Sequence, residues 1–232
     1  MGVAAMRPVD KGAAPAVYDK YQNALSDLRA RLGDYCSYCE RQIETNLAVE
    51  HIQPKSRAAA LCTDWANFLL GCVNCNSSKG STPINLVDYL WPDADNTLRA
   101  FEYVRGGMIQ PDAALAPNLA AKAQATISLT GLDRYPGGPG QAPTTADQRW
   151  LRRQQAWEKA EWARDILAGQ DTNEVRELIV SFATARGEFS IWWTVFAADI
   201  DMRRRLREAF IGTHAASFDV NENPIPRTGG QL

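Results

Sequence analysis

Four cysteines lie in two pairs, and each pair is separated by two residues. Cys36 and Cys39 form CSYC, and Cys72 and Cys75 open CVNCNSSKG. Zinc binds four thiolates in a tetrahedron, and a C-x-x-C loop lets two sulfurs converge on one ion. The pairs therefore predict a structural zinc site. Redox or disulfide use is the alternative, and two pairs separated by a mixed polar segment fit it poorly. Cys62 has no near partner, and we interpret it as a small buried apolar side chain in a loop.

Polar residues between and after these pairs could bind a second cation and accept a proton. His51 is one of only two histidines, and zinc does not require it, so it is free to deprotonate an attacking water. Glu50 would be the anionic ligand of a catalytic Mg²⁺ or Mn²⁺, and Asn76 would offer its amide oxygen to the same ion. Lys79 follows Asn76 by three residues on the expected helix, so it would share that face and contact a phosphate. His214 has no such neighbours and is interpreted as structural.

The elements that must position these side chains are short. The apolar runs LAVEHI and NFLL predict two strands, and CVNCNSSKG predicts a short helix that Gly80 ends. The expected order is therefore strand, loop, strand, helix. Successive side chains of a regular strand point to opposite faces, which would separate Glu50 from His51. We expect the strand to end or twist at this point, and Pro54 favours such an ending.

The pattern of C-x-x-C, an acid followed by His, an Asn, and C-x-x-C-N-x-x-K-G resembles the HNH endonucleases, whose catalytic unit is the ββα-metal fold. The motifs span residues 36 to 80 of the 232. The resemblance implies that His51 is the general base and that Asn67 holds the loop that orients it. It also implies that Glu50 and Asn76 bind the catalytic metal, where the usual residues are Asp and His. The expected catalytic set is His51, Asn67 and Asn76.

The resemblance extends beyond these motifs. RPVDKG, YCSYCE, EHIQPKS and KAQATISLTGLDR are similar to segments of the HNH subunit of Septu-type and retron-associated antiphage systems. In those systems an ATPase accompanies the nuclease. The similarity implies the effector of a bacterial antiphage defence system with an ATPase subunit as its partner.

The expected function is metal-dependent hydrolysis of phosphodiester bonds in DNA. Nothing in the sequence marks an RNA-binding module, so DNA is preferred over RNA. An RNA-cleaving HNH nuclease and a non-catalytic zinc module that recruits a partner remain the alternatives. A single active centre in each chain would need a second copy to cut both strands at once, so a homodimer is a further hypothesis.

Charge and hydropathy exclude other classes of protein. The net charge of −2 argues against a protein that coats nucleic acid, so any nucleic-acid contact needs a local basic patch. Two arginine clusters, 149–153 and 203–207, could contact a phosphate backbone or be solvated helix faces. The sequence contains neither a membrane span nor a secretory signal, which favours the cytoplasm and excludes a membrane partner.

The fold class expected from these patterns is α+β, mainly helical, with a zinc-stapled ββα-metal core. An N-terminal arm and a helix from Pro15 to Leu32 fill residues 1–35. The HNH core, a hairpin at 101–110 and a helix at 119–129 fill residues 36–132. A Pro/Gly-rich linker covers 133–146. In the helical region 147–232 we expect a long helix to Leu167 capped from Thr145, a helix at 172–186, a helix from Ser190 and a loosely held tail from Asn221.

Overall fold

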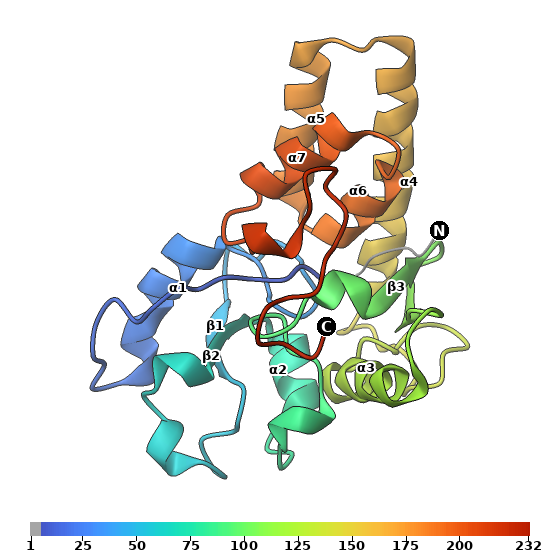
Figure 1. Cartoon of the computed structure of the whole chain (residues 1–232). Helices are drawn as coiled ribbons and strands as arrows, with labels where there is room; N and C mark the ends of the chain where they lie inside the picture. Colours follow the sequence, from blue (N-terminus) through green and yellow to red (C-terminus); the bar gives the residue numbers. More distant parts are fainter. Residues whose placement is uncertain (1–5) are drawn as a thin grey trace.

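The computed structural model describes residues 6–232, and helices and two small sheets alternate along them (Figure 1). The helices are α1 (Leu25–Leu32), α2 (Val73–Lys79), α3 (Pro117–Thr130), α4 (Arg149–Gly169), α5 (Asn173–Arg186), α6 (Phe189–Val195) and α7 (Ile200–Ala209). Strands β1 (Ala48–His51) and β2 (Phe68–Gly71) form one antiparallel pair, and β3 (Phe101–Val104) and β4 (Met108–Pro111) form the other. This mixture of helices and strands confirms the expected α+β class.

The first strand pair and α2 follow the predicted order of strand, loop, strand, helix. The pairing register sets Glu50 opposite Leu69 and His51 opposite Phe68. All four residues of β2 are buried because α1 packs against this strand. The loop between Cys36 and Cys39 is joined to β2, since the Ser37 amide donates to the Leu70 carbonyl at 2.8 Å. Gly80 ends α2 with a φ of +53°, as the sequence predicts.

The hairpin and the helix that follows it form where the sequence predicts them. β3 and β4 turn through Gly106 and Gly107, both of which have positive φ. A Cβ at Gly107 would lie 2.0 Å from the Trp150 carbonyl oxygen, so the hairpin requires glycine to pack against the start of α4. α3 contacts both β4 and α2, and it therefore connects the hairpin to the helix that follows the first sheet.

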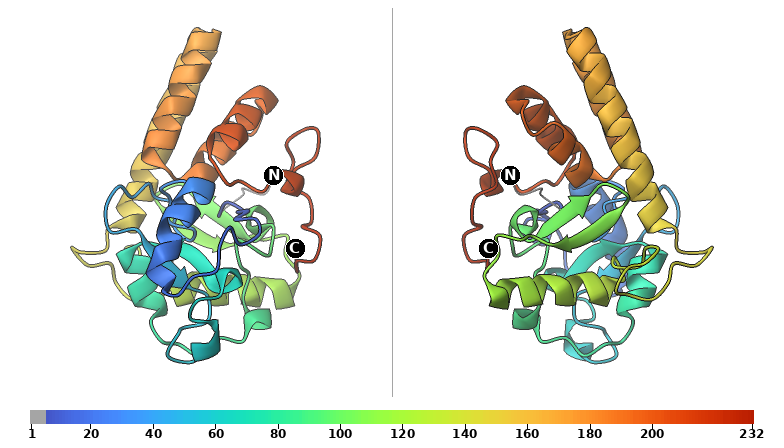
Figure 2. Two further views of the ribbon diagram at one scale, coloured as in Figure 1. Left: turned by 90° about the vertical axis from the view of Figure 1, so that its left-hand side faces the viewer. Right: turned by 90° about the vertical axis from the view of Figure 1, so that its right-hand side faces the viewer.

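Helices α4 and α5 contact each other and project from the body, while α6 and α7 lie near their base (Figures 1 and 2). α5 matches the prediction, and Thr172 caps it by accepting a hydrogen bond from the Val175 amide. Trp192 and Trp193 on α6 are fully buried in the core. The single helix expected from Ser190 is wrong. α6 ends at Val195 and α7 starts after Asp199. The Asp199 carboxylate accepts a hydrogen bond from the Met202 backbone amide and thereby caps α7.

The first expected helix starts later than its sequence pattern indicates. A 3-10 turn, η1 (Tyr21–Ala24), leads into α1, so the prediction of helix from Pro15 is wrong. Tyr18 packs against the Trp65 ring, with 6.0 Å between ring centroids, and this contact holds the segment before η1 outside the helix. The prediction that Gly33 caps α1 is confirmed, with a φ of +73°.

Both ends of the described chain are held by the body. Arg7 donates hydrogen bonds to the carbonyls of Leu32 and Phe210, and Lys11 pairs with Asp93 at 2.6 Å. The arm from residue 6 therefore lies over the body as predicted, while residues 1–5 of that arm lie outside the described residues. The expectation of a loosely held tail is wrong, because the Leu232 carbonyl accepts hydrogen bonds from the backbone amides of Asn96 and Arg227.

The N-terminal end of α4 also differs from its prediction. Residues 133–146 contain neither helix nor strand, as their proline and glycine content indicates. The cap predicted at Thr145 and Gln148 does not form, and α4 begins at Arg149 without a side-chain cap. Asp147 and Arg149 instead form a buried ion pair at 2.6 Å. This pair fixes the start of α4 against the body.

Candidate active site and zinc site

The four paired cysteines come together as predicted. All four side chains are buried, and their sulfur atoms lie within 4.8 Å of one another. Sulfurs about 2.3 Å from a tetrahedral zinc ion lie about 3.8 Å apart. The Cys39 and Cys72 sulfurs are 3.7 Å apart, which agrees with this requirement. The cluster therefore has the donors, the burial and the spacing for one structural Zn²⁺.

Two elements carry the sulfurs. Cys36 and Cys39 lie on the loop bonded to β2, and Cys72 is the N-cap of α2. Backbone amides support the sulfurs, because the Cys72 amide donates to Cys36 Sγ and the Cys75 amide donates to Cys72 Sγ, each at 3.4 Å. Hydrogen bonding from Cys36 and the other thiols lowers the pKa of Cys72. Burial instead raises the pKa of Cys36 and Cys75, so the thiolate form is favoured at Cys72 but not at all four cysteines.

Two arginines lie beside the sulfur cluster. The Arg149 guanidinium donates to Cys75 Sγ at 3.0 Å, and the negative charge of Cys39 and Cys72 helps to raise the pKa of Arg41 against the opposing effect of burial. Four thiolates around Zn²⁺ would carry a net charge of −2, and the two guanidinium groups would balance it. Such groups around a metal site orient its ligands and tune its affinity.

Four of the residues predicted to do chemistry border one cavity of about 210 Å³, whereas Asn67 does not. Glu50 and His51 reach it from β1, and Asn76 and Lys79 reach it from α2. Neighbouring strand residues thus both border the cavity, because β1 ends at His51. Gly71 allows this arrangement: a Cβ at that position would lie 2.9 Å from Glu50 Cβ.

His51 has a defined tautomer. Its Nε2 lies 2.9 Å from the Cys62 carbonyl oxygen, and a carbonyl only accepts, so Nε2 carries the proton. Nδ1 then holds the free lone pair of the neutral ring. The side chain is 7% exposed, and the Tyr21 and Phe68 rings pack against it edge to face. Burial lowers the pKa of His51, which keeps the ring neutral and able to accept a proton.

Asn67 holds the loop that orients this ring. Its amide oxygen accepts from the Gln53 backbone amide at 2.8 Å, and its amide nitrogen donates to the Gln53 and Leu61 carbonyls. These bonds join the two ends of the loop that carries the Cys62 carbonyl. Cys62 itself is partly exposed, so its interpretation as a buried side chain is wrong.

Glu50 and Lys79 form a buried pair. Lys79 Nζ is 2.9 Å from Glu50 Oε1, and Nζ donates to the His51 carbonyl at 2.6 Å. Burial raises the pKa of Glu50, and the Lys79 ammonium opposes this shift. The cavity therefore has an acidic side chain, a neutral imidazole and an amide at its border.

This arrangement agrees with a comparison of the sequence with known families. Residues 36–82 match the family model for HNH endonuclease. A comparison with curated proteins found no match. The matched HNH domain contains both cysteine pairs and every residue for which the sequence predicts a catalytic or metal-binding role, and it indicates nuclease activity.

Within the HNH domain, the lysine nearest to solvent is not the one the sequence singles out. Lys79 is 1% exposed and points its ammonium at Glu50 and the His51 carbonyl, so its contact with a phosphate stays a prediction. Lys55 also borders the cavity, and its Nζ lies 3.0 Å from the Tyr21 hydroxyl. The EHIQPKS motif places Lys55 four residues after His51, which could have indicated it. Tyr21 comes from outside the HNH domain, and no local signal marks it.

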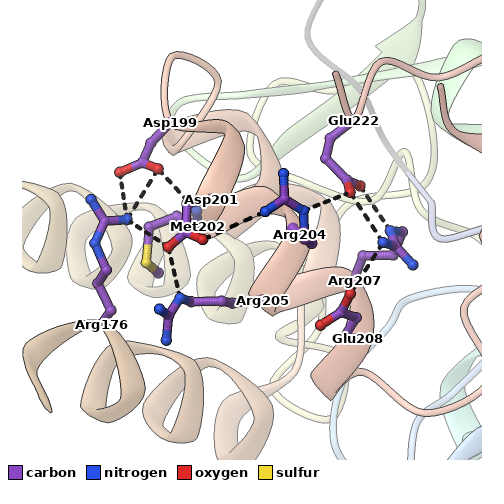
Figure 3. A network of polar contacts seen from close by, with 9 residues as sticks. All are labelled: Arg176, Asp199, Asp201, Met202, Arg204, Arg205, Arg207, Glu208 and Glu222. Atoms are coloured by element: carbon purple, nitrogen blue, oxygen red, sulfur yellow. Dashed lines mark hydrogen bonds and ion pairs between the residues drawn. The ribbon is translucent and has the colours of Figure 1, made fainter. Parts of the chain in front are cut away.

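Each arginine cluster outside the HNH domain matches its expectation only in part: Arg152 and Arg204 are exposed, as a solvated helix face predicts. Arg149 and Arg153 are buried and donate to backbone carbonyls, so they neither contact a phosphate backbone nor form a solvated face. In the second cluster, acidic partners balance the charge (Figure 3). Arg205 pairs with Asp201 at 2.7 Å, and Arg207 pairs with Glu222 at 2.8 Å.

The helices give one further result. In the part of the chain that the structure describes, none of them is both long enough and apolar enough to cross a membrane.

Proposed function

We propose that this protein is a metal-dependent endonuclease that hydrolyses phosphodiester bonds in DNA. One observation carries the proposal: the His51 Nε2 is bonded to the Cys62 carbonyl at 2.9 Å, in a cavity that Glu50 and Asn76 also border. The match of residues 36–82 to HNH endonuclease supports the same reaction class.

In this reaction His51 Nδ1 accepts a proton from water as the water oxygen attacks phosphorus. A new P–O bond forms, the bond from phosphorus to the 3′ oxygen breaks, and that oxygen leaves and takes up a proton. The products carry a 5′-phosphate and a 3′-hydroxyl. The hydrogen bond to the Cys62 carbonyl steadies the positive ring that results, and Asn67 holds that carbonyl in place through the loop. Lys55 is the cation placed to contact a phosphate oxygen.

Glu50 and Asn76 are the residues that would hold the catalytic metal. Glu50 Oε1 is buried without a hydrogen-bond partner, and a carboxylate has about four lone-pair sites, so its contact with Lys79 leaves capacity for a cation. Asn76 borders the same cavity with a partly exposed side chain. Mg²⁺ or Mn²⁺ bound there would supply electrostatic stabilisation of the charge that develops on the phosphate and the leaving oxygen.

The biological setting is proposed on narrower grounds. The RPVDKG and EHIQPKS segments support a bacterial antiphage effector that works with an ATPase subunit in the cytoplasm. Arg7 and Lys11 of RPVDKG hold the N-terminal arm to the body, so this segment also has a structural role. A homodimer would supply two active centres for a double-strand cut, and light scattering of the purified protein tests it directly.

The experiment that tests the nuclease proposal compares cleavage by two histidine variants. Supercoiled plasmid and a structured RNA are each incubated with Mg²⁺ or Mn²⁺ and with wild type, His51→Ala or His214→Ala, all matched in zinc content. His214 is a suitable control because its Nδ1 bonds Ser217 and it does not border the cavity. We expect wild type and His214→Ala to cut DNA and His51→Ala to leave it intact.

Two other results would change the proposal. If the wild type cuts RNA but not DNA, then RNA is the substrate. If wild type and His51→Ala leave both nucleic acids equally intact, with and without an ATPase partner, then the protein is a non-catalytic zinc module.

A further inference from the structure

A second cavity, of about 360 Å³, lies between α4, α5 and the segment that follows Cys39. Arginines line it from three parts of the chain: Arg41 follows the cysteine loop, Arg152 is on α4 and Arg186 is the last residue of α5. It shares no lining residue with the cavity that His51 borders. Its volume is within the range of about 300 to 1,000 Å³ that is usual for ligand sites.

Among the described residues, the three arginines of this cavity form no ion pair with an acidic side chain, unlike Arg149 and Arg176 on the same two helices. Within residues 6–232, none of the three has a carboxylate oxygen within ion-pair distance, whereas Arg149 pairs with one aspartate and Arg176 pairs with three. Arg186 donates only long hydrogen bonds, to the Arg152 carbonyl at 3.2 Å and to Gln155 at 3.4 Å. The Nε atoms of Arg41 and Arg186 are buried without a hydrogen-bond partner. Buried unpaired donors of this kind are costly, and an anionic ligand would satisfy them.

The side chains that line this cavity carry a net positive charge. Glu188 is its one carboxylate, and Arg41 also faces the thiolates of Cys39 and Cys72. Even if the charge of Arg41 is taken as fully balanced by the thiolates, the two positive charges of Arg152 and Arg186 exceed the one negative charge of Glu188. Burial raises the pKa of Glu188 to about 8, which further reduces its negative charge near neutral pH.

We propose that this cavity binds the phosphate groups of a nucleotide or of a nucleic-acid strand. Planar guanidinium groups match phosphate oxygens in pairs, and three of them surround the space. Phe182 borders the same cavity with its ring partly exposed, so a base attached to the phosphate could stack on it. If the ligand is a nucleic-acid strand, the inference rests on the proposed function; if it is a free nucleotide, it does not.

Binding is measured on the zinc-loaded full chain that carries His51→Ala, so that the proposed cleavage does not consume a ligand. Inorganic pyrophosphate is titrated by calorimetry, and a fluorescent single-stranded oligonucleotide is titrated by anisotropy. Arg152→Gln and Arg186→Gln each remove one guanidinium group. Arg164→Gln is the matched control, because Arg164 is on α4, is about half exposed and pairs with Asp165 outside the cavity. Zinc content and far-ultraviolet circular dichroism confirm that every variant is folded.

We expect pyrophosphate to bind the parent and the Arg164→Gln control equally, and each cavity variant to bind about tenfold or more weakly. An accompanying loss of oligonucleotide affinity identifies the ligand as a nucleic-acid strand, and unchanged oligonucleotide affinity identifies it as a free nucleotide. The inference is overturned if pyrophosphate binds the parent more weakly than about 1 mM. It is also overturned if the cavity variants bind as the control does. Because binding is read on a cleavage-deficient chain, its failure is separate from any failure of nuclease activity.

Discussion

Replacing Arg149 by methionine tests whether the helical region and the zinc site form one cooperative unit. The guanidinium of Arg149 is buried and bonds four acceptors: Asp147, Cys75 Sγ and the carbonyls of Thr130 and Gly131. Methionine fills a similar volume but donates no hydrogen bond. The substitution therefore leaves a buried carboxylate whose nearest remaining cation is Arg134, 3.7 Å away and partly exposed.

The expected loss of stability is large. Removing one partner of a buried ion pair costs about 3 to 5 kcal/mol, since the other charge stays buried and unpaired. Domains of this kind have a free energy of unfolding of about 5 to 15 kcal/mol, so Arg149→Met should remove a substantial share of it. Loss of the bond to Cys75 Sγ should also weaken zinc binding by about 10- to 100-fold, the range seen when groups next to metal ligands are removed.

Urea unfolding at saturating zinc measures the first effect, and competition with a zinc chelator measures the second. Arg152→Met is the matched control, because Arg152 is exposed on the same turn of α4, and it should change the stability by no more than about 0.5 kcal/mol. Adding Asp147→Asn to Arg149→Met removes the stranded charge, and it should recover about 0.5 to 3 kcal/mol. If Arg149→Met has the same urea midpoint and zinc affinity as Arg152→Met, the argument from the buried cation is wrong.

Three further predictions concern the HNH domain. Burial lowers the pKa of His51 below 6.5, so the ring should become protonated and unable to accept a proton only in more acid solution. The cleavage rate measured from about pH 5 to 8 should therefore decline only below pH 6.5. A decline that begins above pH 6.5 would contradict this. Asn67→Ala should lower the free energy of unfolding by about 1 to 3 kcal/mol and speed amide hydrogen exchange in the loop 52–62. Unchanged exchange would contradict the role of Asn67 in holding this loop. Gly71→Ala should slow cleavage and destabilise the chain by about 1 to 3 kcal/mol, because its Cβ would collide with Glu50. Gly169→Ala, where a Cβ meets nothing within 4 Å, should leave cleavage unchanged, and equal effects of the two substitutions would refute the steric argument.

The elements that sequence reasoning predicted correctly are those with local signals. Two C-x-x-C pairs at this spacing indicate a metal site without knowledge of the fold, and their sulfurs do converge. The strands β1 and β2, the hairpin and α5 each have an apolar pattern with a glycine or a cap at the end. Such signals depend on residues a few positions apart, so they can be read from the sequence.

Contacts between distant residues account for the errors. A sequence cannot show that Arg149 and Arg153 reach carbonyls on α3 and in the hairpin, because charged residues at a helix start usually face solvent. Asp199 interrupts an apolar pattern that reads as one helix, and only the structure shows it capping α7. Tyr18 is held out of α1 by Trp65, which lies in a different segment.

The four-cysteine cluster, which could hold zinc, lies next to the elements that carry both cavities, and this leads to a last prediction. Asn76 directly follows Cys75 on α2, Arg41 lies two residues after Cys39, and the cysteine loop is bonded to β2, which pairs with the strand that carries His51. Four buried thiolates without their ion would repel one another, so the loop and the start of α2 should separate when zinc is removed. Chelation should therefore abolish both cleavage and pyrophosphate binding, whereas His51→Ala should abolish cleavage alone. Pyrophosphate binding that survives complete zinc removal would show that the arginine cavity does not depend on the cysteine loop.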